Sequence, residues 1–212
     1  MEVYRMNVQS GSFPPLSDKE NQIIDAAIDL IAREGFHGAP MGEIARRAGV
    51  ATGTVYCYFE SKDQLILRAY ERVEQECLAA ILDGYSESSP FPDRFCHLCR
   101  SLLLHLCATP TTFRFIEQFH HSPYGIQCRR ERFSGSRGQG FFTDLFQEGV
   151  SSGEIRPLPI PVLYSLTFGP LIDLVRHHIL GIVILDDPLI HQVVEACLDS
   201  IRTPSSPRKE ST

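Results

Sequence analysis

Side chains suited to contact with DNA lie close together in the first third of the chain. Gly53 and Thr54 are small, so the backbone at that point can closely approach a large ligand. Tyr56 and Tyr58 carry hydroxyl groups that can reach phosphates or base edges, and Lys62 adds a cationic donor that attracts phosphate. These residue types at this spacing favour the binding of double-stranded DNA by a short helix in the major groove.

Two cysteines and two histidines later in the chain raise a second possibility. Cys96 and Cys99 fall on one face of an expected helix, with His97 between them and His105 further along. No second pair has the spacing of structural zinc ligands, and buried thiols are common in helices. A metal-sensing or thiol-sensing role therefore stays an alternative, and the sequence predicts no metal site.

Catalytic motifs are not found in the sequence. It has neither a glycine-rich phosphate loop nor a nucleophile elbow, and its Glu and His residues show no reaction-specific spacing. We therefore expect a binding protein without a cofactor, and an enzyme is the competing class.

The overall charge limits how the chain can attract DNA. Its formal net charge is −6, so the molecule has no broad positive field. Even residues 17–70 hold fewer Lys and Arg than Asp and Glu, which counts against binding to nucleic acid. Binding must therefore use a local surface.

The cysteine count and the apolar segments indicate the compartment. Seven cysteines, an odd number, and an amino terminus without a signal-peptide pattern predict the reducing cytoplasm. The longest apolar region, 160–185, is interrupted by Asp173, Arg176 and two histidines, which are costly in contact with lipid. We expect a buried helix there and no membrane anchor.

Capping residues and helical periodicity predict the first helices. Ser17 and Glu20 form a capping box for a helix at 18–34, which Gly35 closes. Apolar residues follow at helical spacing, as in the interior face of a helix.

Two shorter helices follow around a glycine-containing corner. Pro40 suits the first position of a helix that ends at Gly49, and Thr52 can cap a helix that ends at Phe59. Val55 and Phe59 should then pack inward. Two short helices around such a turn predict a helix-turn-helix.

The rest of the chain also has helical patterns. A second capping box, Ser61 to Gln64, starts a long helix that continues to Gly84. In the last helix, Asp187 is the expected cap and Pro188 the first residue. Other helices are expected at 95–106, 111–120, within the loop-rich segment 120–140, at 141–150 and at 162–180.

We therefore expect an all-α fold: an amino-terminal three-helix helix-turn-helix DNA-binding domain and a larger helical ligand-binding and dimerisation domain. The expected parts are a flexible arm at 1–16, the helix-turn-helix domain at 17–62, the larger domain at 63–203 and a flexible tail at 204–212.

The segment from Gly42 to Leu65 resembles the helix-turn-helix of the TetR family. The resemblance is carried by the pair Ile44-Ala45, the corner Ala48-Gly49-Val50, the helix Gly53-Thr54-x-Tyr56-x-Tyr58-Phe59 and the start Ser61-Lys62-x-x-Leu65. It extends over about residues 18–70, and beyond them only length and helical architecture agree. The alternative reading is that the tyrosines are core residues and Lys62 is merely solvated.

The resemblance implies the residues that contact DNA. They are Thr52, Gly53, Thr54, Tyr56, Cys57, Tyr58 and Lys62. The sequence departs from the family pattern where Ala39, Pro40 and Ala51 replace hydroxyl-bearing residues and where Cys57 replaces a larger polar side chain. These departures predict an unusual affinity or operator preference.

The resemblance also implies an effector pocket in the second domain. Its expected contacts for an apolar or amphipathic small molecule are His105, Phe115, Phe119, His120 and Phe146. Plain core packing is the alternative for each of these residues.

The same resemblance implies a homodimeric repressor that reads a palindromic operator and is released by its effector. The subunits should meet through the helices at 162–180 and 187–203. Apolar stripes support this pairing: Ile190, Val194, Cys197 and Ile201 on one helix, and Leu166, Ile172, Val175 and Ile179 on the other. A ligand-independent DNA binder is the remaining alternative.

Overall fold

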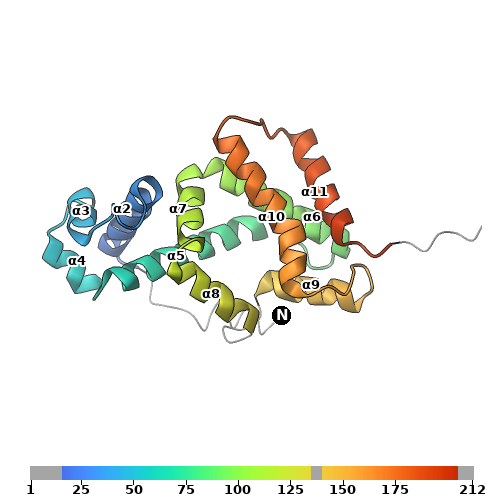
Figure 1. The fold of residues 1–212 in the computed structure, drawn as a ribbon, viewed down its shortest axis with the longest axis horizontal. Helices are drawn as coiled ribbons and strands as arrows, with labels where there is room; N and C mark the ends of the chain where they lie inside the picture. The colour runs from blue at the N-terminus through green and yellow to red at the C-terminus, as the bar shows by residue number, and fades with distance from the viewer. Residues whose placement is uncertain (1–15, 135–139, 205–212) are drawn as a thin grey trace, which may run out of the picture. The chain divides into compact units, whose positions relative to one another are not determined.

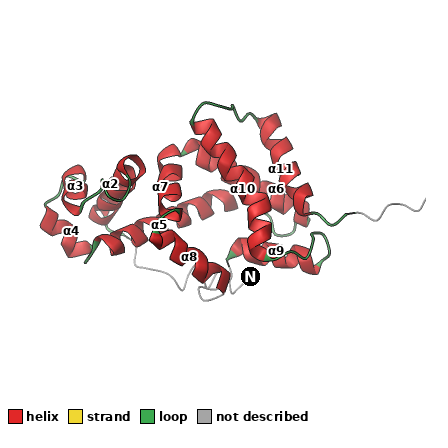
Figure 2. Cartoon of the chain, viewed as in Figure 1, coloured by secondary structure: helices red, strands yellow, loops and turns green. Residues whose placement is uncertain are grey.

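The computed structural model describes residues 16–134 and 140–204, and these consist of α-helices without β-strands (Figure 1 and Figure 2). The helices are α2 Asp18–Glu34, α3 Met41–Arg47, α4 Thr52–Tyr58, α5 Lys62–Leu82, α6 Phe91–Ala108, α7 Pro110–His120, α8 Pro123–Ser134, α9 Phe141–Ser151, α10 Ile160–Ile179 and α11 Asp187–Ile201. The predicted all-α fold is confirmed. None of these helices is long and apolar enough to cross a lipid bilayer. Nearly all of the expected arm and tail, and part of the loop-rich segment near residue 137, lie outside the described residues.

The first capping box forms as predicted. The Ser17 amide donates to Glu20 Oε2 at 2.8 Å, and the Glu20 amide donates to Ser17 Oγ at 3.3 Å. At the other end of α2, Gly35 has φ +69°, a left-handed conformation that favours glycine.

Three predicted helix starts, two of them caps, are wrong by one residue. Pro40 takes the N-cap position of α3 with an extended backbone, so Met41 is the first helical residue. Ala51 precedes α4, and Thr52 is therefore inside that helix and does not cap it. In α11 the carboxylate of Asp186 accepts from the Leu189 amide at 3.0 Å, which makes Asp187 helical.

The second capping box forms only in part. Ser61 Oγ accepts from the Gln64 amide at 3.1 Å, as expected for a cap of α5. The side chain of Gln64, however, accepts from the amide of Glu60 at 2.6 Å instead of reaching back to Ser61.

The described residues form two compact units, each with its own packing. Unit 1 consists of described residues within 1–83 and 104–138, and unit 2 of those within 84–103 and 139–212. By packing, α5, α7 and α8 thus belong with the helix-turn-helix. The expected boundary at residue 62 separates a DNA-binding part from a ligand-binding part. It concerns function and stays a prediction.

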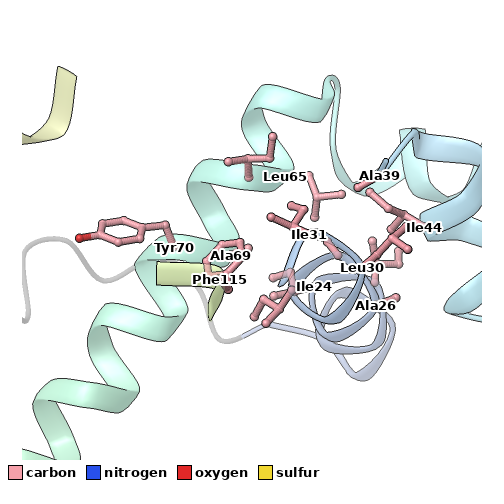
Figure 3. Close-up of a cluster of buried hydrophobic side chains, with 14 of the residues drawn as sticks. Ile24, Ala26, Leu30, Ile31, Ala39, Ile44, Leu65, Ala69, Tyr70 and Phe115 are labelled. Atoms are coloured by element: carbon pink, nitrogen blue, oxygen red, sulfur yellow. The ribbon is translucent and has the colours of Figure 1, made fainter. Parts of the chain in front are cut away.

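Unit 1 is built around α2, which packs against α3, α5 and α7. Ile24 and Ile31 of α2 are fully buried, as is Phe115 of α7. Figure 3 shows Phe115 beside Ala69 of α5, close to Ile24. One continuous cluster of buried side chains therefore includes the helix-turn-helix and α7.

Polar contacts also fix α2 in unit 1. Arg72 of α5 donates to Asn21 Oδ1 at 3.2 Å and forms an ion pair with Asp25. Arg47 of α3 forms an ion pair with Asp29. These contacts join α3 and α5 to α2.

Unit 2 contains α9, α10 and α11, and α10 packs against both of the others. Its core includes the fully buried rings of Phe95 and Phe146. Gly149 is required there, because a Cβ would lie 2.7 Å from the Phe91 ring.

The predicted dimer stripe of the last helix is part of this core. The four side chains on it are at most 4% exposed within a single chain: Ile190, Val194, Cys197 and Ile201. Val175 of α10 is also fully buried, whereas Leu166 is 36% exposed. Only part of the predicted apolar surface is therefore free to meet a second chain.

Candidate DNA-binding surface and effector residues

Helix α4 has one buried and one exposed side. Val55 and Phe59, one turn apart, are buried as predicted. Tyr56 is 52% exposed and Tyr58 is 37% exposed. Because their rings are not used in the core, the alternative reading of the two tyrosines as core residues is not supported.

The remaining candidates on α4 also lie toward solvent. Thr52, Gly53 and Cys57 are exposed, and Thr54 is half-buried. No atom lies within 4 Å of the position that a Cβ of Gly53 would occupy. Packing in the chain therefore does not require a glycine there, and a bare backbone facing outward is what close approach to DNA would need.

Lys62 is placed differently from the residues of α4. Its ammonium group at the start of α5 donates to the carbonyl oxygen of Phe36, in the turn between α2 and α3. Burial lowers the pKa of this ammonium. A lysine has three N–H donors, so a contact with phosphate can be added to the bond with Phe36.

Arg46, on the helix α3 that packs against α4, is a cation that the sequence patterns did not single out. Its side chain is 72% exposed at the end of α3 and forms an ion pair with Glu43, one turn earlier. Exposed pairs of this kind contribute little to stability, so the guanidinium can exchange Glu43 for a phosphate at small cost. Arg46 differs from its neighbour Arg47 only in its surroundings in the folded chain. Arg46 is exposed, whereas the ion pair of Arg47 with Asp29 joins α3 to α2.

We expect Tyr56→Phe and Lys62→Ala to weaken operator binding in different ways. Loss of one phosphate contact at Lys62 should reduce the slope of log affinity against log salt by about one. Tyr56→Phe should weaken binding without a change in slope if the hydroxyl contacts a base edge. Fluorescence anisotropy across a range of salt concentrations measures both effects.

The control for this pair is Arg202→Ala, which removes an exposed cation from unit 2. Its affinity and slope should equal those of the unmodified chain. Wild-type affinity in both Tyr56→Phe and Lys62→Ala would exclude the two side chains from the DNA surface.

The predicted effector residues are divided between the two units. Phe115 and Phe119 are fully buried in unit 1, where Phe119 stacks on Tyr70 with 3.7 Å between ring centroids. The Tyr70 hydroxyl lies 3.1 Å from His120 Nε2. Phe146 belongs to unit 2, where its centroid lies 5.4 Å from that of Tyr164.

His105 has a buried polar atom that is not satisfied. Nε2 is buried and has no hydrogen-bond partner among the described residues. An unpaired buried nitrogen is costly, because it has lost its contact with water. A ligand with a polar group could remove this cost.

Two hollows in the described surface are lined by other residues. One of about 320 Å³ lies in unit 1, and one of about 500 Å³ lies in unit 2. The first is lined by Leu67, Pro123, Tyr124, Gln127, Cys128 and Glu131. Neither hollow is lined by a predicted effector contact, so the location of the effector site stays a prediction.

The thiols of α6 are in an environment that disfavours the reactive thiolate. Burial raises the pKa of Cys96 to about 12, and it also raises the pKa of the fully buried Cys99. A thiolate is the form that binds metals and reacts with oxidants. Among the described residues, no group of three His, Cys, Asp or Glu side chains is placed to hold a metal ion.

Sequence models of one known family match both parts of the chain. The family described as "Bacterial regulatory proteins, tetR family" matches residues 23–69. The family described as "Tetracyclin repressor-like, C-terminal domain" matches residues 90–202, more than half of the chain.

Individual proteins agree with this result. The chain is 27% identical over 153 residues to the fatty acid metabolism regulator protein of Bacillus subtilis, covering 71% of this chain and 78% of that protein. It is 31% identical over 107 residues to an HTH-type transcriptional regulator of Haemophilus influenzae, covering 50% and 57%. A crystal structure of a TetR family transcription regulator from Marinobacter aquaeolei is 28% identical with a TM-score of 0.78, covering 88% and 96%.

Proposed function

Because the chain belongs to the TetR family and is a DNA-binding transcriptional regulator, we propose that it is a homodimeric repressor of a palindromic operator, released by a small apolar or amphipathic effector. The matched proteins are regulators and not enzymes. The observation that carries the proposal is the exposed side of α4, with Gly53 and Tyr56 outward while Val55 and Phe59 are buried.

In this proposal the exposed side of α4 reads one operator half-site in the major groove. Tyr56, Tyr58 and the small residues at the start of α4 contact base edges or the nearby backbone. Lys62 and Arg46 contact phosphates. Because two such helices related by a twofold axis read two half-sites, a dimer requires a palindromic sequence.

The proposed dimer contact uses α10, α11 and the segment between them. Val162 and Leu166 are exposed on α10, and Leu180, Ile182 and Ile184 are exposed just beyond its end. Ile182 and Ile184 are 68% and 80% exposed. A monomer rarely leaves so many large apolar side chains in water, and a second copy of the chain would cover them.

The proposed effector has an apolar body and a polar group. Phe115 and Phe119 supply apolar surface in unit 1, and the unpaired Nε2 of His105 can pair with the polar group. The Bacillus subtilis relative is named for fatty acid metabolism, so fatty acids are the first compounds to test.

Selection of bound sequences from a random DNA pool tests the proposal. A palindromic product is expected, with half-sites separated by about one helical turn. Recovery of no preferred sequence would contradict operator recognition. A selected sequence without symmetry would contradict the dimeric mode.

Effector and operator should weaken each other's binding by the same factor. A ligand shifts the DNA-binding equilibrium only by its different affinities for the two conformations, and the usual coupling is roughly 5-fold to 150-fold. Calorimetric titration of fatty acids of increasing length, with and without operator, measures the factor. Equal affinities in the two titrations would show that the compound is not the effector, or that the regulator is ligand-independent.

A pair of histidine variants can locate the effector's polar group. His105→Leu should weaken effector binding and leave operator affinity unchanged, because the buried Nε2 is the proposed anchor. His121→Leu in the same unit is the control, since that side chain is exposed and lies 2.7 Å from the carbonyl oxygen of Glu117.

A further inference from the structure

Tyr124, near the start of α8, contacts the turn before α3 and the first turn of α5. Its hydroxyl donates to Asp63 Oδ1 in the first turn of α5. Its ring centroid lies 5.8 Å from that of Phe36, in the turn between α2 and α3. The carbonyl of Phe36 accepts from Lys62, the neighbour of Asp63. These four residues form a closed ring of contacts, which we call the α8 corner.

The α8 corner is fixed to the end of α7. Ser122 Oγ donates to the carbonyl of Phe119 at 2.6 Å and accepts from the Gly125 amide at 3.3 Å. A Cβ on Gly125 would lie 2.2 Å from the Phe119 oxygen, so only glycine allows this close approach. Because the backbones touch here, α8 cannot shift on α7 without displacing Tyr124.

The same end of α7 holds residues of the proposed effector site. The ring of Phe119 stacks on Tyr70, and its centroid lies 6.4 Å from that of Tyr124. The hydroxyl of Tyr70 bonds to His120. Contacts therefore run without a gap from Phe119 and His120 to the start of α5.

We propose that Tyr124 is a positioning residue for operator recognition, which holds the start of α5 and the turn before α3 in the orientation that reads DNA. This inference rests on the proposed function and adds a route for its regulation. A ligand that displaces Phe119 or His120 moves Tyr124, and the bond to Asp63 breaks. The start of α5, with Lys62, then loses its fixed orientation.

The Tyr124 hydroxyl is a constant donor at ordinary pH. Burial and the bond to Asp63 raise the pKa of the Tyr124 phenol to about 12. The phenol therefore keeps its proton, and movement of the helix rather than titration must break the contact.

Tyr124→Phe tests the inference, because it removes the hydroxyl and keeps the ring against Phe36 and Phe119. Loss of a hydrogen bond to a charged group should lower operator affinity by up to about tenfold. Affinity for unrelated DNA should fall less than this, because binding of Lys62 to phosphates there depends on its charge more than on a fixed orientation. Anisotropy with the selected operator and with a scrambled duplex gives the ratio of the two affinities.

The variant Asp63→Ala, alone and combined with Tyr124→Phe, makes the test specific to the bond between Tyr124 and Asp63. If the bond acts on DNA binding, Tyr124→Phe should have little further effect once Asp63 is absent. Tyr85→Phe is the matched control, since it removes a hydroxyl that bonds to Arg94 in unit 2. It should leave the affinity ratio unchanged.

Three results would overturn the inference. They are a wild-type affinity ratio in Tyr124→Phe, an equal loss on both DNAs, and additive effects in the double variant. A wild-type chain that selects no DNA sequence would overturn the proposed function and this inference together. If the wild type selects a sequence and the variants have the same affinity ratio as the wild type, this inference alone is overturned.

Discussion

Leu166→Glu is expected to separate the proposed dimer into monomers that bind an operator at least about a hundredfold more weakly than the wild-type protein. Leu166 is 36% exposed on α10, beside the exposed Val162, and neither side chain is used in the core of unit 2. A carboxylate there would be buried without a partner if two chains meet on this surface. A monomer also loses the gain from binding two half-sites at once, which is about 10² to 10⁴ in affinity.

Sedimentation velocity and anisotropy measure the two parts of this expectation. Gln147→Glu is the matched control, because it adds the same charge to an exposed position of α9 in the same unit. It should sediment as the wild type does. A Leu166→Glu protein that stays dimeric would place the subunit contact elsewhere.

Val194→Glu is expected to unfold unit 2 rather than only separate two subunits. Val194 is 2% exposed and lies among Ile190, Leu198 and the other buried residues of α11. An unpaired charge at such a site costs on the order of 3–5 kcal/mol, a large fraction of the stability of a domain. Circular dichroism should show a lower melting temperature and loss of helix at 37 °C.

Gln192→Glu adds the same charge to an exposed position of the same helix and should melt with the wild type. A Val194→Glu protein that melts like the wild type but sediments as a monomer would contradict this expectation. That result would assign the stripe of α11 to a subunit contact.

The sequence was most informative where a local pattern determines a local structure. The capping box at Ser17 and the closing Gly35 define α2 because each involves residues at most four positions apart. The inward direction of Val55 and Phe59 likewise follows from the geometry of one helical turn. The errors at Pro40, Thr52 and Asp187 are shifts of one residue. At Asp187 two adjacent aspartates could each cap, whereas Pro40 and Ala51 take the N-cap position without a side-chain hydrogen bond.

A periodic apolar stripe does not reveal what covers it. The spacing of Ile190, Val194 and Ile201 predicted a buried face, and that face is buried. Whether the cover is the same chain or a second one depends on contacts between distant segments. The exposed surface of α10 could be recognised only after α11 had been placed.

Residue type alone also could not separate core from pocket. Phe115 and Phe119 are apolar and at helical spacing, which suits either role, and both are fully buried in unit 1. The bond between Tyr124 and Asp63 joins residues 61 positions apart, and no sequence pattern predicts such a pair. Its recognition required the structure.

The buried cluster that joins α2 to α7 limits how the protein can be recombined with its relatives. Phe115 packs beside Ile24 in one continuous core, so a segment ending at residue 62 carries only part of the surface that its own α2 needs. A chimaera that exchanges the first three helices must therefore also match the apolar side of α7. For the construction of a biosensor with a new operator, the exchangeable part is defined by this core and not by the boundary of the DNA-binding motif.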